Sequence, residues 1–193
     1  MIDAVVLAGG ASTRFDGDKL AAAMEGGTVL GRSVATARAA AGRVTLVIGP
    51  DDAQPDVLGV TVARDPVAHR GPLAGLVTGL DALGEPDLVL VLAGDMPDVQ
   101  PAVLDALLGR LRAEGDLAIV HLEADPVATL PFAARASIVL PAARALLAAD
   151  RRSLRALLDT VPSIAIPSAD WRALDPQGRT LVDIDTRDDL RRT

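Results

Sequence analysis

One stretch near the N-terminus, residues 2–19, constrains the fold of this chain more than any other. It begins with an apolar run, Ala4 to Ala8, which is typical of a buried parallel strand, and it continues into a turn of small residues, Gly9 to Thr13. Two cations, Arg14 and Lys19, follow within the reach of one loop. Backbone N–H groups and cations just past the carboxyl end of a strand are suited to binding a polyphosphate. The alternative is an ordinary glycine-rich turn between a strand and a helix.

Lys19 is the single lysine of the chain, in which every other Lys or Arg position is an arginine. This usage indicates a position that needs a compact ammonium rather than a planar guanidinium. Two common phosphate loops do not match. A P-loop lysine is followed by Ser or Thr, but Lys19 is followed by Leu20. A dinucleotide-binding loop has an acidic residue about 20 positions after its glycines, whereas Asp51 and Asp52 come roughly 40 positions on.

Composition narrows the class of protein. A chain of 193 residues with 50% hydrophobic content can bury one sizeable core, so we expect one domain over residues 1–193. A net charge of −7 and an aromatic content of 2% argue against a nucleic-acid partner. The chain has no cysteine, which excludes disulfides and thiolate metal sites. Neither a targeting signal nor an apolar span of membrane length is recognisable, so we expect a cytoplasmic protein without a membrane partner.

Strand and helix patterns alternate along the chain. The expected strands cover residues 4–8, 43–49, 60–65, 87–95, 117–122, 164–166 and 181–184, with a further extended segment at 127–134. The expected helices cover residues 29–41, 73–83, 101–113, 137–149 and 153–158, followed by a closing helix from Thr186. Repeated βα units predict an α/β fold, a Rossmann-like three-layer sandwich with a mostly parallel sheet and helices on both faces. In such a sheet, ligands bind beyond the carboxyl ends of the strands.

Several residues are expected at that edge of the sheet. Asp95 ends the most apolar strand in the motif AGDMP, where a carboxylate can bind Mg²⁺ or can simply cap the next turn. Asp65 ends its strand similarly, although Asp-Pro is also a common turn pair. The segment from Gly71 to Gly75 is expected to begin a helix, with glycines that allow close approach either of a ligand or of the sheet.

Four segments resemble a known family in matching order along the whole chain: LAGGASTRFDGDK, GPLAGLVTGL, AGDMP and the terminal DIDTRDDL. They are similar to the molybdenum cofactor guanylyltransferases and to the MobA-like nucleotidyltransferases around them. The resemblance implies an enzyme that moves GMP from GTP onto the phosphate of molybdopterin and releases pyrophosphate with the help of Mg²⁺. It also implies GTP and the molybdenum cofactor as substrates, and transient contact with cofactor-synthesis or molybdoenzyme-maturation proteins.

The resemblance assigns roles to individual positions of this chain. Arg14, Lys19 and Asp95 would be catalytic, with Asp95 as the metal ligand. Asp183, Asp185 and Arg152 would meet the second substrate, Arg152 lying in the segment AADRRSLRALL. The nucleotide site would be formed by Leu7, Ala8, Gly9, Gly10, Lys19, Asp65, Gly71, Pro72, Leu73 and Asp95.

The last motif departs from the family pattern. The family typically has N-x-N-T-P-E-E-L, whereas this chain has Asp183, Asp185 and Arg187 in place of both asparagines and the proline. DIDT and GDMP are more similar to the sister enzymes that transfer CMP, while LAGG and GPLAG favour guanine. Three further classes of protein are compatible with these residues: a sugar- or polyol-phosphate nucleotidyltransferase, a glycosyltransferase with Asp183-Ile-Asp185 as its metal pair, and a non-catalytic nucleotide-binding module.

Overall fold

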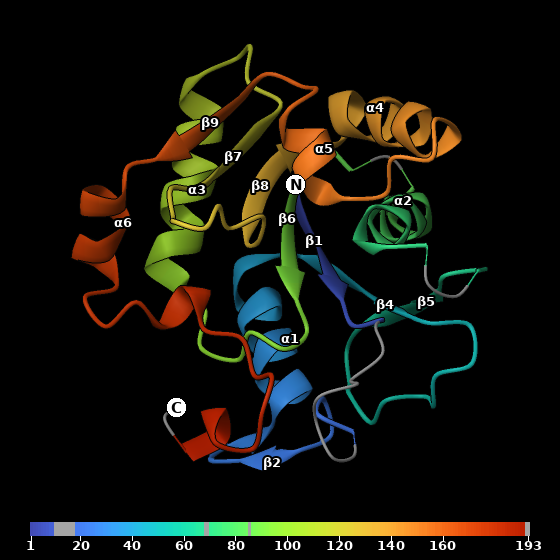
Figure 1. Cartoon of the computed structure of the whole chain (residues 1–193), viewed down its shortest axis with the longest axis vertical. Helices are drawn as coiled ribbons and strands as arrows, with labels where there is room; N and C mark the ends of the chain where they lie inside the picture. The colour runs from blue at the N-terminus through green and yellow to red at the C-terminus, as the bar shows by residue number, and fades with distance from the viewer. Residues whose placement is uncertain (10–17, 68–69, 85, 192–193) are drawn as a thin grey trace.

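The fold is built on one central sheet of seven strands (Figure 1). The computed structural model describes residues 1–9, 18–67, 70–84 and 86–191. The strands lie in the order β5-β4-β1-β6-β8-β7-β9, and β8 runs antiparallel to both of its neighbours in an otherwise parallel sheet. They are β1 (Ile2–Leu7), β4 (Arg43–Ile48), β5 (Thr61–Arg64), β6 (Leu88–Ala93), β7 (Ile119–Leu122), β8 (Phe132–Arg135) and β9 (Ser163–Ile166).

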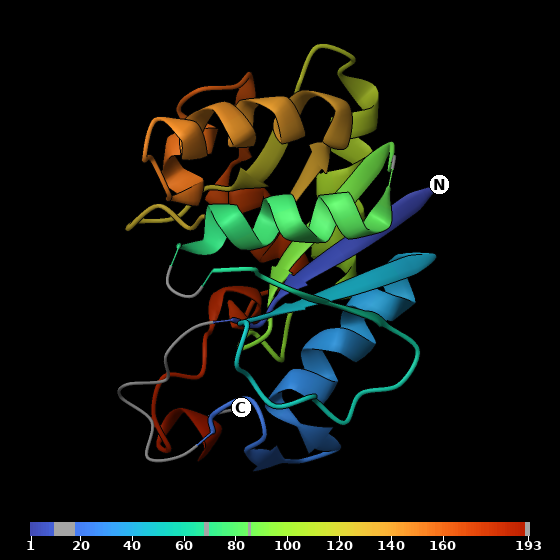
Figure 2. The ribbon, with the colours of Figure 1, turned by 90° about the vertical axis from the view of Figure 1, so that its right-hand side faces the viewer.

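Helices cover both faces of this sheet, as the side view shows (Figure 2). One face carries α1 (Val29–Ala40), α3 (Pro101–Ala113) and α6 (Ser168–Leu174). The other face carries α2 (Pro72–Leu83), α4 (Ala136–Ala148) and α5 (Leu154–Leu158). The three-layer α/β architecture that the alternating pattern predicts is therefore confirmed.

The central strands supply apolar side chains to both layers, which explains their continuous hydrophobic runs. Successive side chains of a strand point to opposite faces. Val6 therefore packs in the core beneath α1 and α3, while Val5 packs in the core beneath α2. In β6, Leu90 and Val91 divide between the two cores in the same way, and each of these four side chains is fully buried.

Helix α2 lies unusually close to the sheet because of two glycines. A methyl group at Gly79 would lie 2.5 Å from Val5 Cγ1, and one at Gly75 would lie 3.2 Å from Leu7 Cδ2. Both positions therefore serve the packing of a helix on strands, which for Gly75 is one of the two roles expected for glycines in the segment from Gly71 to Gly75. Gly71 itself has a φ of 83°, a backbone conformation that side-chain-bearing residues rarely adopt.

A charged cluster joins β1, β4 and α2 at the amino edge of the sheet. The fully buried carboxylate of Asp3 accepts hydrogen bonds from Arg43 Nε (3.0 Å) and Nη2 (2.7 Å). Arg43 Nη1 also donates to the carbonyl of Leu83 at the end of α2 (3.0 Å). This paired, bidentate contact stabilises the edge of the sheet that lies away from the carboxyl ends of the strands.

The C-terminal region differs from the sequence expectation. The predicted strand over residues 181–184 is wrong, since this region consists of the 3₁₀ turn η1 (Arg179–Leu181) and irregular chain. The predicted closing helix from Thr186 is also wrong, since the regular structure there is the 3₁₀ turn η2 (Asp189–Arg191). The backbone N–H of Ile184 donates to the carbonyl of Asp95 (2.9 Å), so this segment bonds to a loop rather than to a sheet edge.

Three further differences concern short elements. The extended segment expected at 127–134 forms a strand only from Phe132 onward. Helix α6 and the two-stranded hairpin of β2 (Ala23–Met24) and β3 (Gly27–Thr28) are absent from the sequence prediction. Such short segments contain too few residues to display a period. No helix in the described parts of the chain is long and apolar enough to cross a membrane.

The close contact of α2 with β1 can be tested by Gly79→Ala. The added methyl group meets Val5 at 2.5 Å and Val47 at 3.0 Å, so we expect a loss of about 1–3 kcal/mol in the free energy of unfolding. Gly109→Ala in α3 is the matched control, because nothing lies within 4 Å of its added methyl group. Removing a helical glycine there should stabilise the protein by up to about 1 kcal/mol. Equal stability of the two variants in urea denaturation would contradict this account.

Candidate active site

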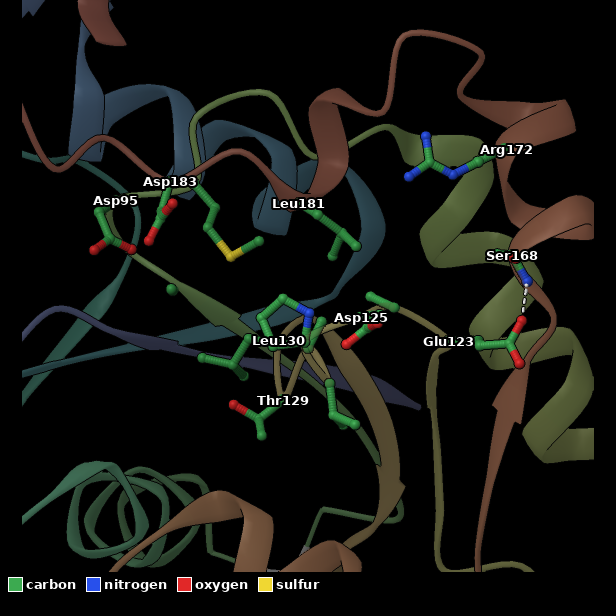
Figure 3. Close-up of a pocket in the computed structure, with 15 residues that line it drawn as sticks. Asp95, Glu123, Asp125, Thr129, Leu130, Ser168, Arg172, Leu181 and Asp183 are labelled. Atoms are coloured by element: carbon green, nitrogen blue, oxygen red, sulfur yellow. Dashed lines mark hydrogen bonds between the residues drawn. The ribbon is translucent and has the colours of Figure 1, made fainter. Parts of the chain in front are cut away.

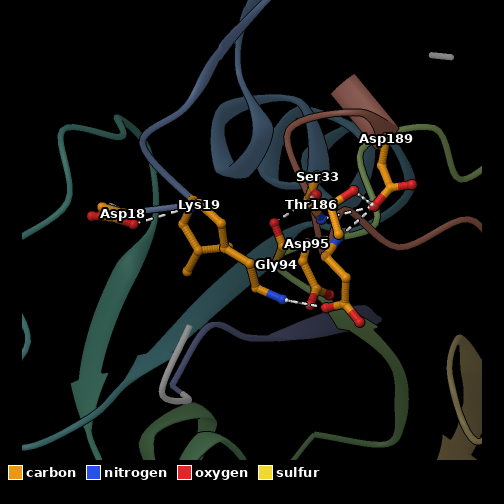
Figure 4. A network of polar contacts seen from close by, with 9 residues as sticks. Asp18, Lys19, Ser33, Gly94, Asp95, Thr186 and Asp189 are labelled. Carbon is orange, nitrogen blue, oxygen red and sulfur yellow. Dashed lines mark hydrogen bonds and ion pairs between the residues drawn. The ribbon is translucent and has the colours of Figure 1, made fainter. Parts of the chain in front are cut away.

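A single ammonium group connects three distant parts of the chain at the carboxyl edge of the sheet (Figure 4). Lys19 Nζ donates to Asp95 Oδ2 at 2.7 Å and to Asp185 Oδ1 at 3.1 Å. The side chain of Lys19 is only 15% exposed, compared with 24% for Asp95 and 40% for Asp185. The structure thus brings together three predicted site residues: Lys19 from the first motif, Asp95 from the motif AGDMP and Asp185 from the terminal motif.

The backbone around Lys19 is fixed by local hydrogen bonds. Asp18 caps the following turn, because its Oδ1 accepts from the N–H groups of Leu20 (3.0 Å) and Ala21 (3.3 Å). The carbonyl of Leu20 accepts from the N–H of Leu30 in the first turn of α1 (3.0 Å). Lys19 therefore projects from a segment that is tied to a helix.

Asp95 is held where β6 ends. The N–H of Gly94 donates to the carbonyl of Leu7 (2.8 Å), which continues the parallel ladder one residue past the strand. The carbonyl of Gly94 lies 3.0 Å from the buried hydroxyl of Ser33. On its own backbone, the carbonyl of Asp95 accepts from Ile184. These contacts fix the loop that presents the carboxylate.

The charges of this cluster affect one another. Burial alone would lower the pKa of Lys19, but its hydrogen bonds and its charge interactions with Asp95 and Asp185 outweigh burial and raise that pKa above its ordinary value. Asp183 has a raised pKa, because part of its carboxyl is removed from water and because Asp185 and Asp95 carry like charge nearby. Among the described residues, Lys19 is the ammonium that faces the carboxylates of Asp95 and Asp185, and Asp183 adds like charge nearby.

A large pocket opens beside Asp95 on the β7–β9 side of the sheet (Figure 3). We call it the Asp183 pocket; its volume is about 1140 Å³. Asp95 and Asp183 lie on one side of it, and Arg172 and Glu123 lie on the opposite side (Figure 3). The segment between β7 and β8, residues 123–130, forms a third wall.

A second pocket lies between residues 18–30 and the chain that follows β4. We call it the Ala8 pocket; its volume is about 560 Å³. Apolar side chains and carboxylates line it: Ala8, Leu20, Ala21, Leu30, Ile48, Ala53, Pro55, Val57, Asp18, Asp52 and Asp56, together with Thr28 and Gln54. The carboxylate of Asp52 accepts from the N–H of Gly49 (2.7 Å), and Arg64 donates to three carbonyls of residues 49–52, so this wall of the pocket is ordered by hydrogen bonds.

The predicted site residues fall into separate groups in the structure. Leu7, Ala8 and Gly9 end or follow β1, beside the cluster of Lys19, Asp95 and Asp185. Asp183 lines its pocket from the same tail as Asp185. Gly10 and Arg14 lie outside the described residues.

Gly71, Pro72 and Leu73 form the beginning of α2, and Arg152 lies against them. The carbonyl of Arg152 accepts from the N–H of Leu73 (3.3 Å), and its guanidinium pairs with Asp150 (2.7 Å). Leu73 is fully buried in the core, and its backbone N–H is already bonded to Arg152. The prediction grouped Arg152 with Asp183, whereas the residues that line the Asp183 pocket do not include Arg152.

Asp65 occupies a turn. Its N–H donates to the carbonyl of Ile48 (2.9 Å), and its Oδ1 accepts from the N–H of Val67 (3.4 Å). These contacts agree with the turn-forming role that an Asp-Pro pair suggests, and they leave the second carboxylate oxygen for other partners.

Sequence reasoning missed Arg172 and Asp189. Arg172 stacks over the ring of the buried Trp171, 4.8 Å from its centroid, and no local pattern connects it with the remote Asp183. Asp189 does have a signal, since Thr186-x-x-Asp189 matches the spacing of a capping box. Among the described residues, no three His, Cys, Asp or Glu side chains are arranged to hold a metal ion by themselves.

Fold and site together define an α/β protein with cationic and anionic groups gathered at the carboxyl edge of its sheet, as nucleotide-handling proteins have. The model of the MobA-like NTP transferase domain matches residues 4–164. A probable molybdenum cofactor guanylyltransferase from Chloroflexus aggregans is 33% identical over 201 aligned residues, which cover 99% of this chain and 92% of that protein. The chain therefore belongs to the MobA-like NTP transferase family and is a nucleotidyltransferase.

Solved structures share the fold. Molybdopterin-guanine dinucleotide biosynthesis protein A from Archaeoglobus fulgidus superposes with a TM-score of 0.80 at 19% identity, over 98% of this chain and 95% of that one. 4-Diphosphocytidyl-2C-methyl-D-erythritol synthase from Anaerococcus prevotii superposes with a TM-score of 0.69 at 16% identity, over 98% of this chain and 94% of that one. One of these proteins is named for guanine and the other for cytidine, so the fold does not decide the base.

Lys19→Ala tests the central contact. We expect nucleotidyl transfer, measured as pyrophosphate release from a nucleoside triphosphate, to fall by about 10²–10³-fold, because one charge-neutralising donor is lost. Lys19→Arg is the matched variant: it keeps the charge but replaces a compact ammonium by a planar fork, so its activity should be intermediate. Circular dichroism should show both variants folded. Wild-type pyrophosphate release by Lys19→Ala would rule out a catalytic role for this side chain.

Proposed function

We propose that this protein transfers GMP from GTP onto the terminal phosphate of molybdopterin or of the molybdenum cofactor, and that pyrophosphate is the second product. The observation that carries the proposal is the contact of Lys19 with Asp95 and Asp185 in a chain that aligns over nearly its whole length with a relative named as a guanylyltransferase. The two pockets on either side of this contact supply room for two substrates.

We assign a Mg²⁺ site to Asp95 and Asp185. Lys19 Nζ lies within hydrogen-bond distance of both carboxylates, so they already face a shared position of positive charge, and this donor set fits a small dication. Mg²⁺ is usually held by one or two carboxylates together with phosphate oxygens and water, so these two carboxylates are sufficient for such a site. When bound, Mg²⁺ neutralises phosphate charge and aligns the leaving pyrophosphate.

The chemistry requires no protein nucleophile. A phosphate oxygen of the acceptor attacks the α-phosphorus of GTP and forms a new P–O bond, while the bond from the α-phosphorus to the α–β bridging oxygen breaks. A phosphate monoester with a second pKa near 6 is already largely deprotonated at pH 7, so no general base is needed. The task of Lys19 is to stabilise the developing charge on the phosphates. Arg14 remains a predicted second cation.

We propose that the base occupies the Ala8 pocket. Carboxylates of Asp18, Asp52 and Asp56 line this pocket. Guanine presents two adjacent donors, its N1–H and its 2-amino group, which one carboxylate can accept together, whereas the corresponding edge of cytosine presents a single amino donor. Of the two tail residues that favour transfer of CMP, Asp183 lies in the pocket on the opposite side and is proposed to meet the second substrate, while Asp185 is assigned to the metal site.

The second substrate is proposed to lie in the Asp183 pocket. Asp183 and Glu123 supply acceptors for the amino and ring N–H groups of a pterin, and Arg172 supplies the only cationic side chain among the residues that line it. The pocket adjoins Asp95, so an acceptor bound there can reach the triphosphate side of the site.

Competition calorimetry with GTP, CTP, ATP and UTP in the presence of Mg²⁺ tests the choice of base. We expect GTP to bind at least tenfold more tightly than CTP, about 1.4 kcal/mol, because cytosine leaves acceptors of the Ala8 pocket unpaired. Molybdopterin is then added to confirm release of pyrophosphate from the preferred nucleotide. Equal or tighter binding of CTP would assign the chain to the cytidylyl branch.

Asp183→Ala tests the acceptor pocket. We expect the KM for molybdopterin to rise about tenfold, since hydrogen bonds to a charged acceptor contribute roughly 1.5–3 kcal/mol, while the KM for the nucleotide stays unchanged. Asp183→Asn retains one acceptor oxygen and should give a smaller effect. Asp105→Ala removes an exposed carboxylate from α3 and serves as the control. If Asp183→Ala and Asp105→Ala behave alike, Asp183 does not contact the acceptor.

A further inference from the structure

The side chain of Asp185 comes from an irregular segment, so its direction must be fixed by something other than a strand or a helix. Its side chain is 40% exposed, yet its carboxylate meets Lys19 Nζ at 3.1 Å. Irregular chain presents a side chain from a constant position only where the backbone that carries it is held, because an unheld backbone retains conformational entropy. The contacts on either side of Asp185 show how this is achieved.

On the N-terminal side, Ile184 anchors the segment. Its side chain is fully buried and packs with Val29, with Met24 and Leu190 at the margin of the same cluster. Its N–H donates to the carbonyl of Asp95 (2.9 Å). One residue before Asp185, the tail is therefore attached both to the hairpin region and to the loop that carries Asp95.

On the C-terminal side, Asp189 anchors the segment (Figure 4). Its Oδ2 accepts three hydrogen bonds: from the N–H of Asp185 (3.2 Å), from the N–H of Thr186 (2.7 Å) and from the hydroxyl of Thr186 (2.8 Å). In return, the carbonyl of Thr186 accepts from the N–H of Asp189 (3.2 Å). A single carboxylate oxygen thus fixes the backbone of Asp185 itself.

We infer that Asp189 is a positioning residue for the metal and triphosphate site, which it orients through the backbone of Asp185. The inference rests on the proposed function, since it gives Asp185 the role of a metal ligand. Groups that orient a ligating carboxylate without touching the metal commonly change metal affinity by 10–100-fold when they are removed. The three hydrogen bonds of Asp189 belong to this kind of support.

The neighbouring residue offers a matched control. Asp188 has the same charge and lies one position away, but its carboxylate faces Arg191 at 3.3 Å, with both side chains more than three-quarters exposed. Exposed pairs of this kind contribute little to stability. Asp188→Ala therefore removes the same charge from the same turn without removing the hydrogen bonds to Asp185 and Thr186.

The experiment measures the affinity of the full chain for Mn²⁺ alone, by electron paramagnetic resonance, together with the melting temperature. We expect Asp189→Ala to bind Mn²⁺ about tenfold more weakly than the wild type. Asp189→Asn retains an acceptor oxygen, so it should remain within about twofold of the wild type, as should Asp188→Ala. Thr186→Val removes one of the three hydrogen bonds and should weaken binding by about fivefold, beyond the margin of the controls, which keeps the test available if Asp189→Ala does not fold.

A double-mutant cycle tests whether Asp189 acts through Asp185. In an Asp185→Asn background, adding Asp189→Ala should change Mn²⁺ affinity by less than about twofold, since the group that Asp189 orients is already gone. A full tenfold loss in that background, or wild-type affinity in Asp189→Ala or in Thr186→Val, would overturn the inference while leaving the proposed reaction intact. Absence of Mn²⁺ binding to the wild type would overturn both the proposed metal site and this inference.

Discussion

The contact of one ammonium with two carboxylates is the interaction on which the site depends. Asp95 lies 76 positions and Asp185 lies 166 positions from Lys19 in the sequence. The contact between their charges joins these distant segments. A lysine largely removed from water needs such partners, because an unpaired charge there would be costly. Two carboxylates from different segments face this ammonium, and such a pair of donors is what the proposed metal site requires.

The sheet supplies the rigid frame for this contact. Asp95 follows directly from the buried strand β6, and the N–H of Gly94 still bonds to β1, so two motifs share a fixed register. The stabilising ion pair of Asp3 and Arg43 lies at the opposite edge. The ion pair that stabilises the sheet is thereby separated from the charged groups proposed to meet the substrates. The positions of those groups are therefore not constrained by that ion pair.

Net charge does not predict what this protein binds. The chain carries a formal charge of −7, and yet its proposed substrates are polyanions. In the proposed arrangement the local field decides, because Lys19 and a bound metal ion would act at a few ångströms, whereas the remaining surface charge is screened by salt. In the proposed arrangement, the carboxylates of the two pockets accept hydrogen bonds from N–H groups of the guanine and the pterin and do not contact phosphate groups.

The sequence by itself determined the mostly parallel sheet and the expectation that Lys19 and Asp95 both lie at its carboxyl edge. Long apolar runs in β1, β4 and β6 and amphipathic helical patterns are local signals, and the carboxyl ends of parallel strands meet at one edge whatever the details of packing. Tertiary structure alone decided the tail: Asp183 and Asp185 lie on irregular chain rather than on a strand. It also placed Arg152 against Gly71 and turned Gly75 and Gly79 toward the sheet. These outcomes depend on contacts between residues far apart in the chain, and local sequence patterns do not predict such contacts.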